Sequence, residues 1–185
     1  MSLEYAILGL LSWKPFNGYD LKKIFAESPI YYWSGNNNQI YRTLLSLFED
    51  GLVTRTIEEQ ENLPPKKVYS LTTAGQQMLE NWLRLAPELP QRKHAFLLQL
   101  GWADRLPADE LDLLLSQYQE EVSALLMLSR AQIKLPFYPD RTVREKILWQ
   151  SIHSNLIGFY QFELDWVQHL RLSLAGLEKE SDESK

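Results

Sequence analysis

Amide side chains gather in the first half of the sequence, where Asn36, Asn37, Asn38 and Gln39 precede Arg42. An amide can form two hydrogen bonds with the edge of adenine, and a guanidinium can do the same with guanine. At the start of a helix, this set of residue types is therefore suited to reading base edges in a DNA groove. The alternative is an ordinary helix with a polar cap and a solvated face, which uses the same residue types.

A helix that begins within residues 34–38 would position these side chains. Its apolar face is predicted by the i, i+4, i+7, i+8 spacing of Ile40, Leu44, Leu47 and Phe48. Asn36 and Gln39 have the spacing of a capping box, and Gly51 can end the helix in a left-handed conformation. The polar residues that then face away from the apolar stripe are Asn37, Asn38, Gln39, Arg42, Thr43 and Ser46.

Two shorter helices are predicted before this one. The first begins after Ser2 and ends before Pro15, with Leu3, Ile7, Leu10 and Leu11 as its buried positions. The second follows a turn at Asn17-Gly18. Its apolar residues are Tyr19, Leu21, Ile24 and Phe25, and Lys22 and Lys23 are expected to be exposed.

A β-hairpin and a fourth helix are predicted after Gly51. The segments Leu52–Ile57 and Lys67–Thr72 are rich in β-branched and aromatic residues, and they flank a polar loop of nine or ten residues. Thr73 and Gln76 have capping-box spacing for a helix that ends near Leu85. The order of these elements predicts three helices with a β-hairpin wing.

The second half of the sequence predicts long helices separated by Pro136 and Pro139, and we expect a boundary that divides the chain into domains 1–86 and 87–185. Near-heptad stripes predict antiparallel helices that pack with each other or with a partner subunit. The candidate dimerisation residues are Leu111, Leu115, Tyr118, Val122, Leu125, Ile152, Leu156, Phe159, Trp166 and Leu170. Thr142 and Glu145 can cap the last helix, and the segment after Gly176 is expected to fray.

Composition and spacing argue against an enzyme or a metalloprotein. The chain has 185 residues, no cysteine and a formal net charge of −5. His94, His153 and His169 lack metal-ligand spacing, and no glycine-rich phosphate loop or nucleophile elbow is present. We therefore expect no catalytic residue, no metal and no cofactor. The apolar run Tyr5–Leu11 is too short to cross a bilayer, so we expect a cytoplasmic protein without membrane contact.

Several segments together resemble the PadR-type winged-helix transcriptional regulators. They occur in the order and at the spacing of that family, over most of residues 3–79. The matching segments are Ala6–Leu11, Asn17–Leu21, Gln39–Leu44, Leu47–Val53 and Lys67–Gly75. The pattern of the C-terminal half is similar to that of the branch containing the virulence activator AphA. The fold class implied is mostly α with a small β-hairpin, an N-terminal winged helix-turn-helix and a C-terminal dimerisation domain of long helices.

The resemblance implies a homodimer that binds double-stranded DNA at a pseudo-palindromic operator, as a repressor more often than an activator. The third helix would enter the major groove. Tyr41 would either hydrogen-bond a phosphate or pack in the core with its hydroxyl outside. Further candidate phosphate contacts are Lys22, Lys23, Lys66 and Lys67.

Two other functions remain open on the sequence. In one, the C-terminal helices bind a small aromatic effector at Trp149, Phe162 and Trp166, and DNA release is the output; core packing is the competing role of each of these rings. In the other, the winged helix binds proteins instead of DNA, which the acidic pair Glu58-Glu59 on the wing would favour.

Overall fold

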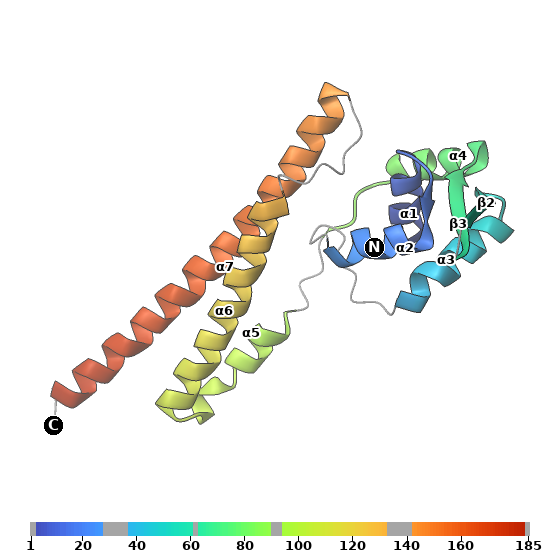
Figure 1. The fold of residues 1–185 in the computed structure, drawn as a ribbon. Coiled ribbons are helices and arrows are strands. Elements are labelled where there is room, and N and C mark those ends of the chain that lie inside the picture. The colour runs from blue at the N-terminus through green and yellow to red at the C-terminus, as the bar shows by residue number, and fades with distance from the viewer. Residues whose placement is uncertain (1–2, 28–36, 61–62, 90–93, 133–141, 184–185) are drawn as a thin grey trace. The chain divides into compact units, whose positions relative to one another are not determined.

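The structure is a computed structural model that describes residues 3–27, 37–60, 63–89, 94–132 and 142–183. The chain divides into two compact units, Met1–Glu88 and Leu89–Lys185. The protein is mostly helical, with a small antiparallel sheet and a winged helix-turn-helix in the first unit and long helices in the second (Figure 1). This architecture confirms the predicted fold class.

The helices of the first unit are α1 (Leu3–Leu11), α2 (Gly18–Glu27), α3 (Asn37–Glu49) and α4 (Thr73–Leu83). They pack around one apolar core, which contains all four buried positions predicted for α1. On α2, Leu21 and Phe25 are buried but Tyr19 is 67% exposed. Its grouping with the apolar face of α2 is wrong, because a residue two positions before Leu21 lies on the opposite side of a helix.

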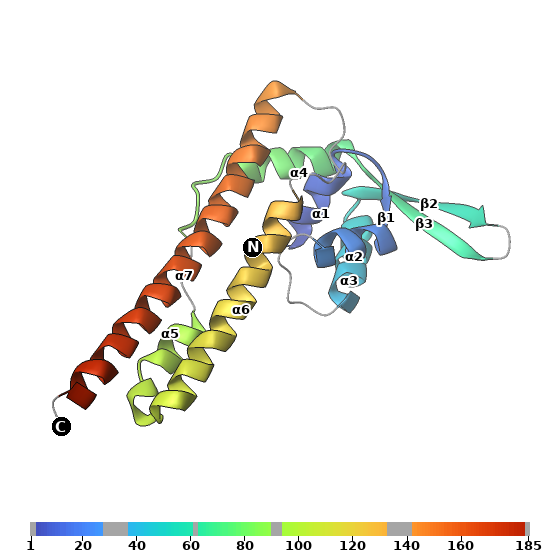
Figure 2. The same cartoon turned by 60° about the vertical axis from the view of Figure 1, so that its left-hand side comes forward.

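The sheet of the first unit has the order β1-β3-β2, with every pair antiparallel. Its strands are β1 (Phe16–Asn17), β2 (Val53–Gln60) and β3 (Leu63–Leu71). Val53 pairs with Leu71 on one side of β3, and Phe16 pairs with Tyr69 on the other. In Figure 2 the β2–β3 hairpin extends away from the helices of its unit as a wing.

The hairpin differs from its prediction, because the strands continue through the segment expected to be a loop. Glu58 pairs with Lys66 and Gln60 with Leu63, with an irregularity in register between Glu58 and Gln60. β3 includes Pro64 and Pro65. Since β1 pairs with β3 only at residues 68 and 69, the proline-bearing end has one neighbouring strand, where a missing N–H is tolerated. The pairing of β1 was not predicted from the sequence.

The ends of α3 and α4 follow local rules. Gly51 has a φ of 70°, which confirms the left-handed end predicted after α3. The N-cap of α4 is Thr72, whose Oγ1 accepts a hydrogen bond of 3.0 Å from the N–H of Gly75. The prediction of a capping box at Thr73 is therefore one residue late. Asn36, the predicted cap of α3, lies outside the described residues.

The second unit contains α5 (Ala95–Leu100), a 3₁₀ turn η2 (Ala103–Arg105), α6 (Ala108–Gln132) and α7 (Val143–Glu183). α6 and α7 run side by side in opposite directions (Figures 1 and 2). Oγ1 of Thr142 accepts a hydrogen bond of 3.2 Å from the N–H of Glu145, as the capping prediction requires. The helix continues past Gly176 to Glu183, and fraying of this end stays a prediction. α5 was not predicted.

Candidate nucleic-acid interface

Helix α3 separates an apolar face from a polar one. Ile40, Leu44 and Leu47 are each at most 2% exposed and belong to the core of the first unit. The exposed polar residues of the helix include Asn38, Gln39, Arg42 and Ser46, as predicted, whereas Thr43 is half-buried. The side chain of Asn37 lies outside the described part of the chain.

Two of the predicted groove-facing hydroxyls have local partners. Oγ1 of Thr43 donates to the carbonyl of Gln39 at 2.9 Å, and Oγ of Ser46 donates to Oδ2 of Asp50 at 3.4 Å. Neither bond occupies the amide of Gln39 or the guanidinium of Arg42. The exposed side chains of α3 whose chemical types can read a base edge are Asn38, Gln39 and Arg42.

Tyr41 lies against the start of α2. A Cβ atom added to Gly18 would come within 2.5 Å of the Tyr41 ring, so this glycine leaves the space that the ring occupies. The Tyr41 side chain is nevertheless 47% exposed. The Tyr41 ring can thus pack against Gly18 while its hydroxyl remains accessible to solvent.

The predicted phosphate contacts fall into two groups. Lys22 is half-buried, and Lys23 is exposed with its ammonium 3.9 Å from Glu27. Lys66 and Lys67 lie on β3, and the structure brings them to the same hollow as Tyr41. That hollow has a volume of about 400 Å³, and its lining includes Tyr19 and Arg55, which the sequence analysis did not select. Alternation along β2 puts Arg55 on the same face as Val53, but it does not show that this face borders α3.

Arg55 is positioned by its neighbours on both sides. Its guanidinium lies over the ring of Phe48 on α3, 4.5 Å from the ring centroid. Its backbone pairs with Tyr69, a buried residue of β3. The Arg55 side chain is thus held between the wing and α3.

A polar contact surrounded by aromatic rings joins the helices of the second unit. The Tyr118 hydroxyl on α6 donates to Glu163 on α7 at 2.7 Å, and it lies 3.1 Å from Nε2 of His94. Phe96 stacks on Tyr118 at a centroid distance of 3.8 Å, and Trp166 meets both rings edge-on. Burial, followed by the hydrogen bond to Glu163 and its charge, raises the pKa of Tyr118 well above its ordinary value. The hydroxyl therefore remains protonated and acts as a donor.

The three residues predicted to contact an effector do not form one site within the chain. Trp149 and Trp166 lie on the same continuous helix, where a separation of seventeen residues corresponds to about 25 Å. Phe162 is 61% exposed, whereas Trp166 packs against Phe96 and Tyr118. A single pocket made by these three side chains is therefore not present in one chain.

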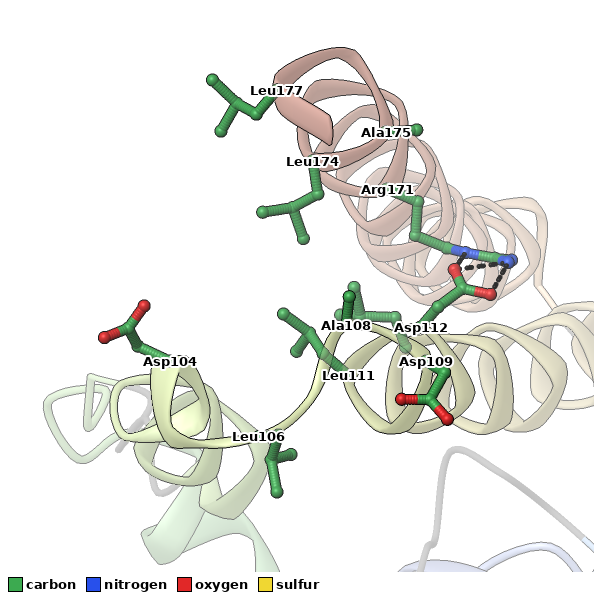
Figure 3. Close-up of a pocket in the computed structure, with 11 residues that line it drawn as sticks. Asp104, Leu106, Ala108, Asp109, Leu111, Asp112, Arg171, Leu174, Ala175 and Leu177 are labelled. Carbon is green, nitrogen blue, oxygen red and sulfur yellow. Dashed lines mark hydrogen bonds and ion pairs between the residues drawn. The ribbon is translucent and has the colours of Figure 1, made fainter. Parts of the chain in front are cut away.

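An open groove lies beside the contact between α6 and the C-terminal part of α7. It has a volume of about 710 Å³, and it is lined by Leu106, which follows η2, by leucines of α6 and α7, and by acidic residues. Figure 3 shows Leu111 and Leu174 directed toward the same space. At one side, Arg171 makes two hydrogen bonds to Asp112, of 2.9 and 3.0 Å, and a third of 2.9 Å to Gln119. This groove was not predicted from the sequence.

The described ranges contain neither a metal site nor a membrane-spanning helix. No group of three or more His, Cys, Asp or Glu side chains there could hold a metal ion. No helix in this part of the chain is long and apolar enough to span a membrane.

An exposed polar face on the third helix, next to a β-hairpin wing, is the arrangement of a winged helix-turn-helix domain. Residues 7–81 match the family described as "Transcriptional regulator PadR-like family". The negative transcriptional regulator PadR of Bacillus subtilis is 35% identical over 135 residues, which are 72% of this chain and 74% of that protein. The chain belongs to the PadR-like family: it is a DNA-binding transcriptional regulator and not an enzyme.

Solved structures of the family support the same fold over nearly the whole chain. The structure of B. subtilis PadR in complex with operator DNA has a TM-score of 0.78 and 25% identity, covering 93% of this chain and 98% of that one. The same protein in complex with p-coumaric acid has a TM-score of 0.73 at 25% identity, covering 94% and 98%. The virulence activator AphA of Vibrio cholerae has a TM-score of 0.69 at 25% identity, covering 95% and 99%.

Proposed function

We propose that the protein is a cytoplasmic homodimeric repressor that binds a pseudo-palindromic operator through α3 of each subunit. The observation that supports this proposal most directly is the exposed polar face of α3, which carries Asn38, Gln39 and Arg42. This face lies opposite the buried Ile40 and Leu44. The name of the B. subtilis relative, a negative regulator, supports repression. The operator complex solved for that relative supports a DNA target.

Specificity would come from the side chains of α3 that reach base edges. Each amide or guanidinium paired with a base contributes about 1–3 kcal/mol of discrimination against the wrong base. Two subunits that each neutralise three or four phosphates give a slope of log affinity against log salt of roughly −5 to −7. Because the chain carries a net charge of −5, its non-specific binding should be weaker than that of a basic regulator.

Selection of bound fragments from random DNA tests this proposal directly. The purified full chain should enrich a motif with dyad symmetry and half-sites about one helical turn apart. Arg42→Ala and Asn38→Ala should each relax the preference at particular positions of the motif. Arg84→Ala, which removes an exposed charge at the end of α4, is the matched control and should enrich the wild-type motif. Equal affinity of the wild type for all duplexes would contradict the proposal.

We further propose that a small aromatic effector reduces DNA binding. The structure of the B. subtilis relative with p-coumaric acid supports this type of regulation. Titration with p-coumaric acid should change the tryptophan fluorescence and release the operator in the same concentration range. Release without a saturable change in fluorescence would contradict binding near a tryptophan. An absence of both effects would remove p-coumaric acid as an effector.

A role as a protein-interaction module makes the opposite prediction for α3. In that case Asn38→Ala and Arg42→Ala would leave the function in cells intact, although both side chains lie on the exposed face. Loss of repression in either variant, with the protein still folded and expressed, would support DNA binding.

A further inference from the structure

The hollow beside Tyr41 is built by three separate parts of the first unit. Asn17 and Tyr19 come from the β1–α2 junction, Tyr41 from α3, and Arg55, Lys66 and Lys67 from the wing. Its volume of about 400 Å³ is formed within the first unit alone. The hollow therefore lies where the base of the wing meets α3 and the start of α2.

The lining of the hollow has a charge opposite to that of the whole chain. It contains three cationic side chains and no carboxylate, although the net charge of the chain is −5. None of Arg55, Lys66 and Lys67 forms an ion pair with another residue that the structure describes. The neighbouring Asp20 is engaged by the side chain of Asn17, whose Oδ1 also caps the backbone of α2 at 2.9 Å. The hollow is thus suited to an anion.

Two packing contacts hold parts of the lining in position before any ligand arrives. The Arg55 guanidinium rests on the Phe48 ring at 4.5 Å, and the Tyr41 ring occupies the space left by Gly18. A group that is already oriented loses less conformational entropy on binding. Phenolic hydroxyls, arginine and lysine are the side chains that commonly contact DNA phosphates.

The position of the hollow on α3 distinguishes a DNA phosphate from a free anion. Tyr41 and Leu45 line it, and they are the helical neighbours of Arg42 and Ser46 on the exposed polar face. When a helix enters the major groove, the sugar-phosphate backbones run along both of its sides. A backbone phosphate is therefore the anion that would approach this edge of α3.

We infer that this hollow holds one backbone phosphate of each operator half-site, with Arg55 and Lys67 as its cations and the hydroxyls of Tyr19 and Tyr41 as donors. The inference rests on the proposed binding of α3 to DNA, and it adds Tyr19 and Arg55 to the interface. The contact fixes the register of the protein on the duplex without specifying a base.

The test uses the full chain and an operator duplex obtained by selection with the wild-type protein. Arg55→Gln, Lys67→Gln and Tyr41→Phe each remove one charge or hydroxyl from the hollow. Arg84→Gln, outside the hollow, removes the same charge as Arg55→Gln and is the control. Affinity is measured over a range of salt concentrations. It is measured again on duplexes in which a single phosphate is replaced by an uncharged methylphosphonate.

Arg55→Gln and Lys67→Gln should each weaken binding at least about tenfold, as expected for loss of a hydrogen bond to a charged group. With one hollow in each subunit, each should also reduce the magnitude of the salt slope by about two. One methylphosphonate position in each half-site should weaken the wild type clearly more than it weakens Arg55→Gln, which retains only Lys67 and the two hydroxyls as contacts to that phosphate. Tyr41→Phe should weaken binding and leave the salt slope unchanged.

Specific binding by Arg55→Gln and Lys67→Gln with the wild-type salt slope would overturn the inference and leave the proposed function intact. So would a methylphosphonate effect that persists undiminished in Arg55→Gln. Failure of the wild type to select any DNA would instead overturn the proposed function, and the inference with it. Lys67 is exposed, so its variant gives the answer if Arg55→Gln does not fold.

Discussion

The Tyr118 hydroxyl occupies the middle of the contact between α6 and α7. Its partner Glu163 has a side chain only 12% exposed, and the hydrogen bond between them is 2.7 Å long. A carboxylate at such a position is stabilised by its hydrogen bonds, since water reaches it poorly.

Replacement of Tyr118 by phenylalanine keeps the stacked ring and removes this donor. We expect Tyr118→Phe to lower the free energy of unfolding by about 1.5–3 kcal/mol, the range for a hydrogen bond to a charged group. Urea unfolding at fixed protein concentration measures the effect. Glu163→Gln retains an acceptor for the hydroxyl and should cost less. Equal stability of wild type and Tyr118→Phe would show that the bond contributes nothing net.

The burial of His153 should make the stability of the fold depend on pH. It is 7% exposed on α7, and burial lowers its pKa below the ordinary value. The unfolded chain, with an ordinary pKa of about 6.5, then binds the proton more readily than the folded chain. The contribution to stability is therefore complete above about pH 6.5 and declines as the pH falls toward the lowered pKa.

The variant His153→Gln isolates this effect. The difference in unfolding free energy between wild type and variant should shrink as the pH is lowered from 7.5 to about 5.5. His169→Gln, at an exposed position of the same helix, serves as the control. A constant difference between wild type and His153→Gln across this range would contradict the prediction.

At this scale the sequence predicted part of the candidate site and missed the rest. Asn38, Gln39 and Arg42 could be identified because helical periodicity alone determines which residues oppose Ile40 and Leu44. Tyr19 and Arg55 could not, because the hollow depends on how a strand pairs and on where a hairpin lies against α3. Those are long-range contacts that local spacing does not encode.

At the scale of the elements, Gly75 allows the start of α4 to lie directly against the backbone of Leu52. A Cβ atom at Gly75 would lie 2.1 Å from the backbone oxygen of Leu52. That oxygen also accepts hydrogen bonds from the N–H of Thr72 and from its Oγ1, at 3.1 and 2.9 Å. The start of α4 therefore cannot move away from Leu52 without loss of these two hydrogen bonds.

Gly75→Ala should consequently lower the free energy of unfolding by about 3 kcal/mol or prevent folding, as overpacking against a fixed backbone does. Gly9→Ala is the matched control, since nothing lies within 4 Å of a Cβ atom there. In the interior of α1 that change should raise stability by as much as about 1 kcal/mol. Thermal unfolding followed by circular dichroism measures both. A Gly75→Ala protein as stable as the wild type would refute the packing argument.

Element types were predicted better than their ends. The helices α1, α2, α3, α6 and α7 follow from spacing and capping residues, because both signals are local. The full length of β2 and β3 could not be predicted from local signals, because Pro64 and Pro65 usually indicate a loop. Their place in β3 depends on β1 ending early along the opposite edge, which is a property of the assembled sheet.

For the molecule as a whole, exposed apolar side chains on α7 support the proposed homodimer. Leu115 and Val122 are already buried within a single chain, so these two predicted residues mainly hold α6 to α7. Ile152 and Phe159 are 42% and 45% exposed. Exposed apolar residues of this kind on a long helix favour association with a second copy.

We therefore expect the wild type to sediment as a dimer at micromolar concentration and Phe159→Glu to shift it toward monomer. Leu83→Glu, an apolar position of the first unit that is 67% exposed, should leave the dimer unchanged. Analytical ultracentrifugation distinguishes the two species. A monomeric wild type, or a Phe159→Glu protein as dimeric as the wild type, would contradict the prediction.

Polar side chains join α6 to α7 at three separate levels. Arg171 binds Asp112 and Gln119, Tyr118 binds Glu163, and Arg130 binds Gln161 at 2.9 Å. A slip of one helix past the other by one turn, about 5.4 Å, would break all of these bonds together. The helical pair is thus resistant to sliding, and α6 and α7 should move as one body.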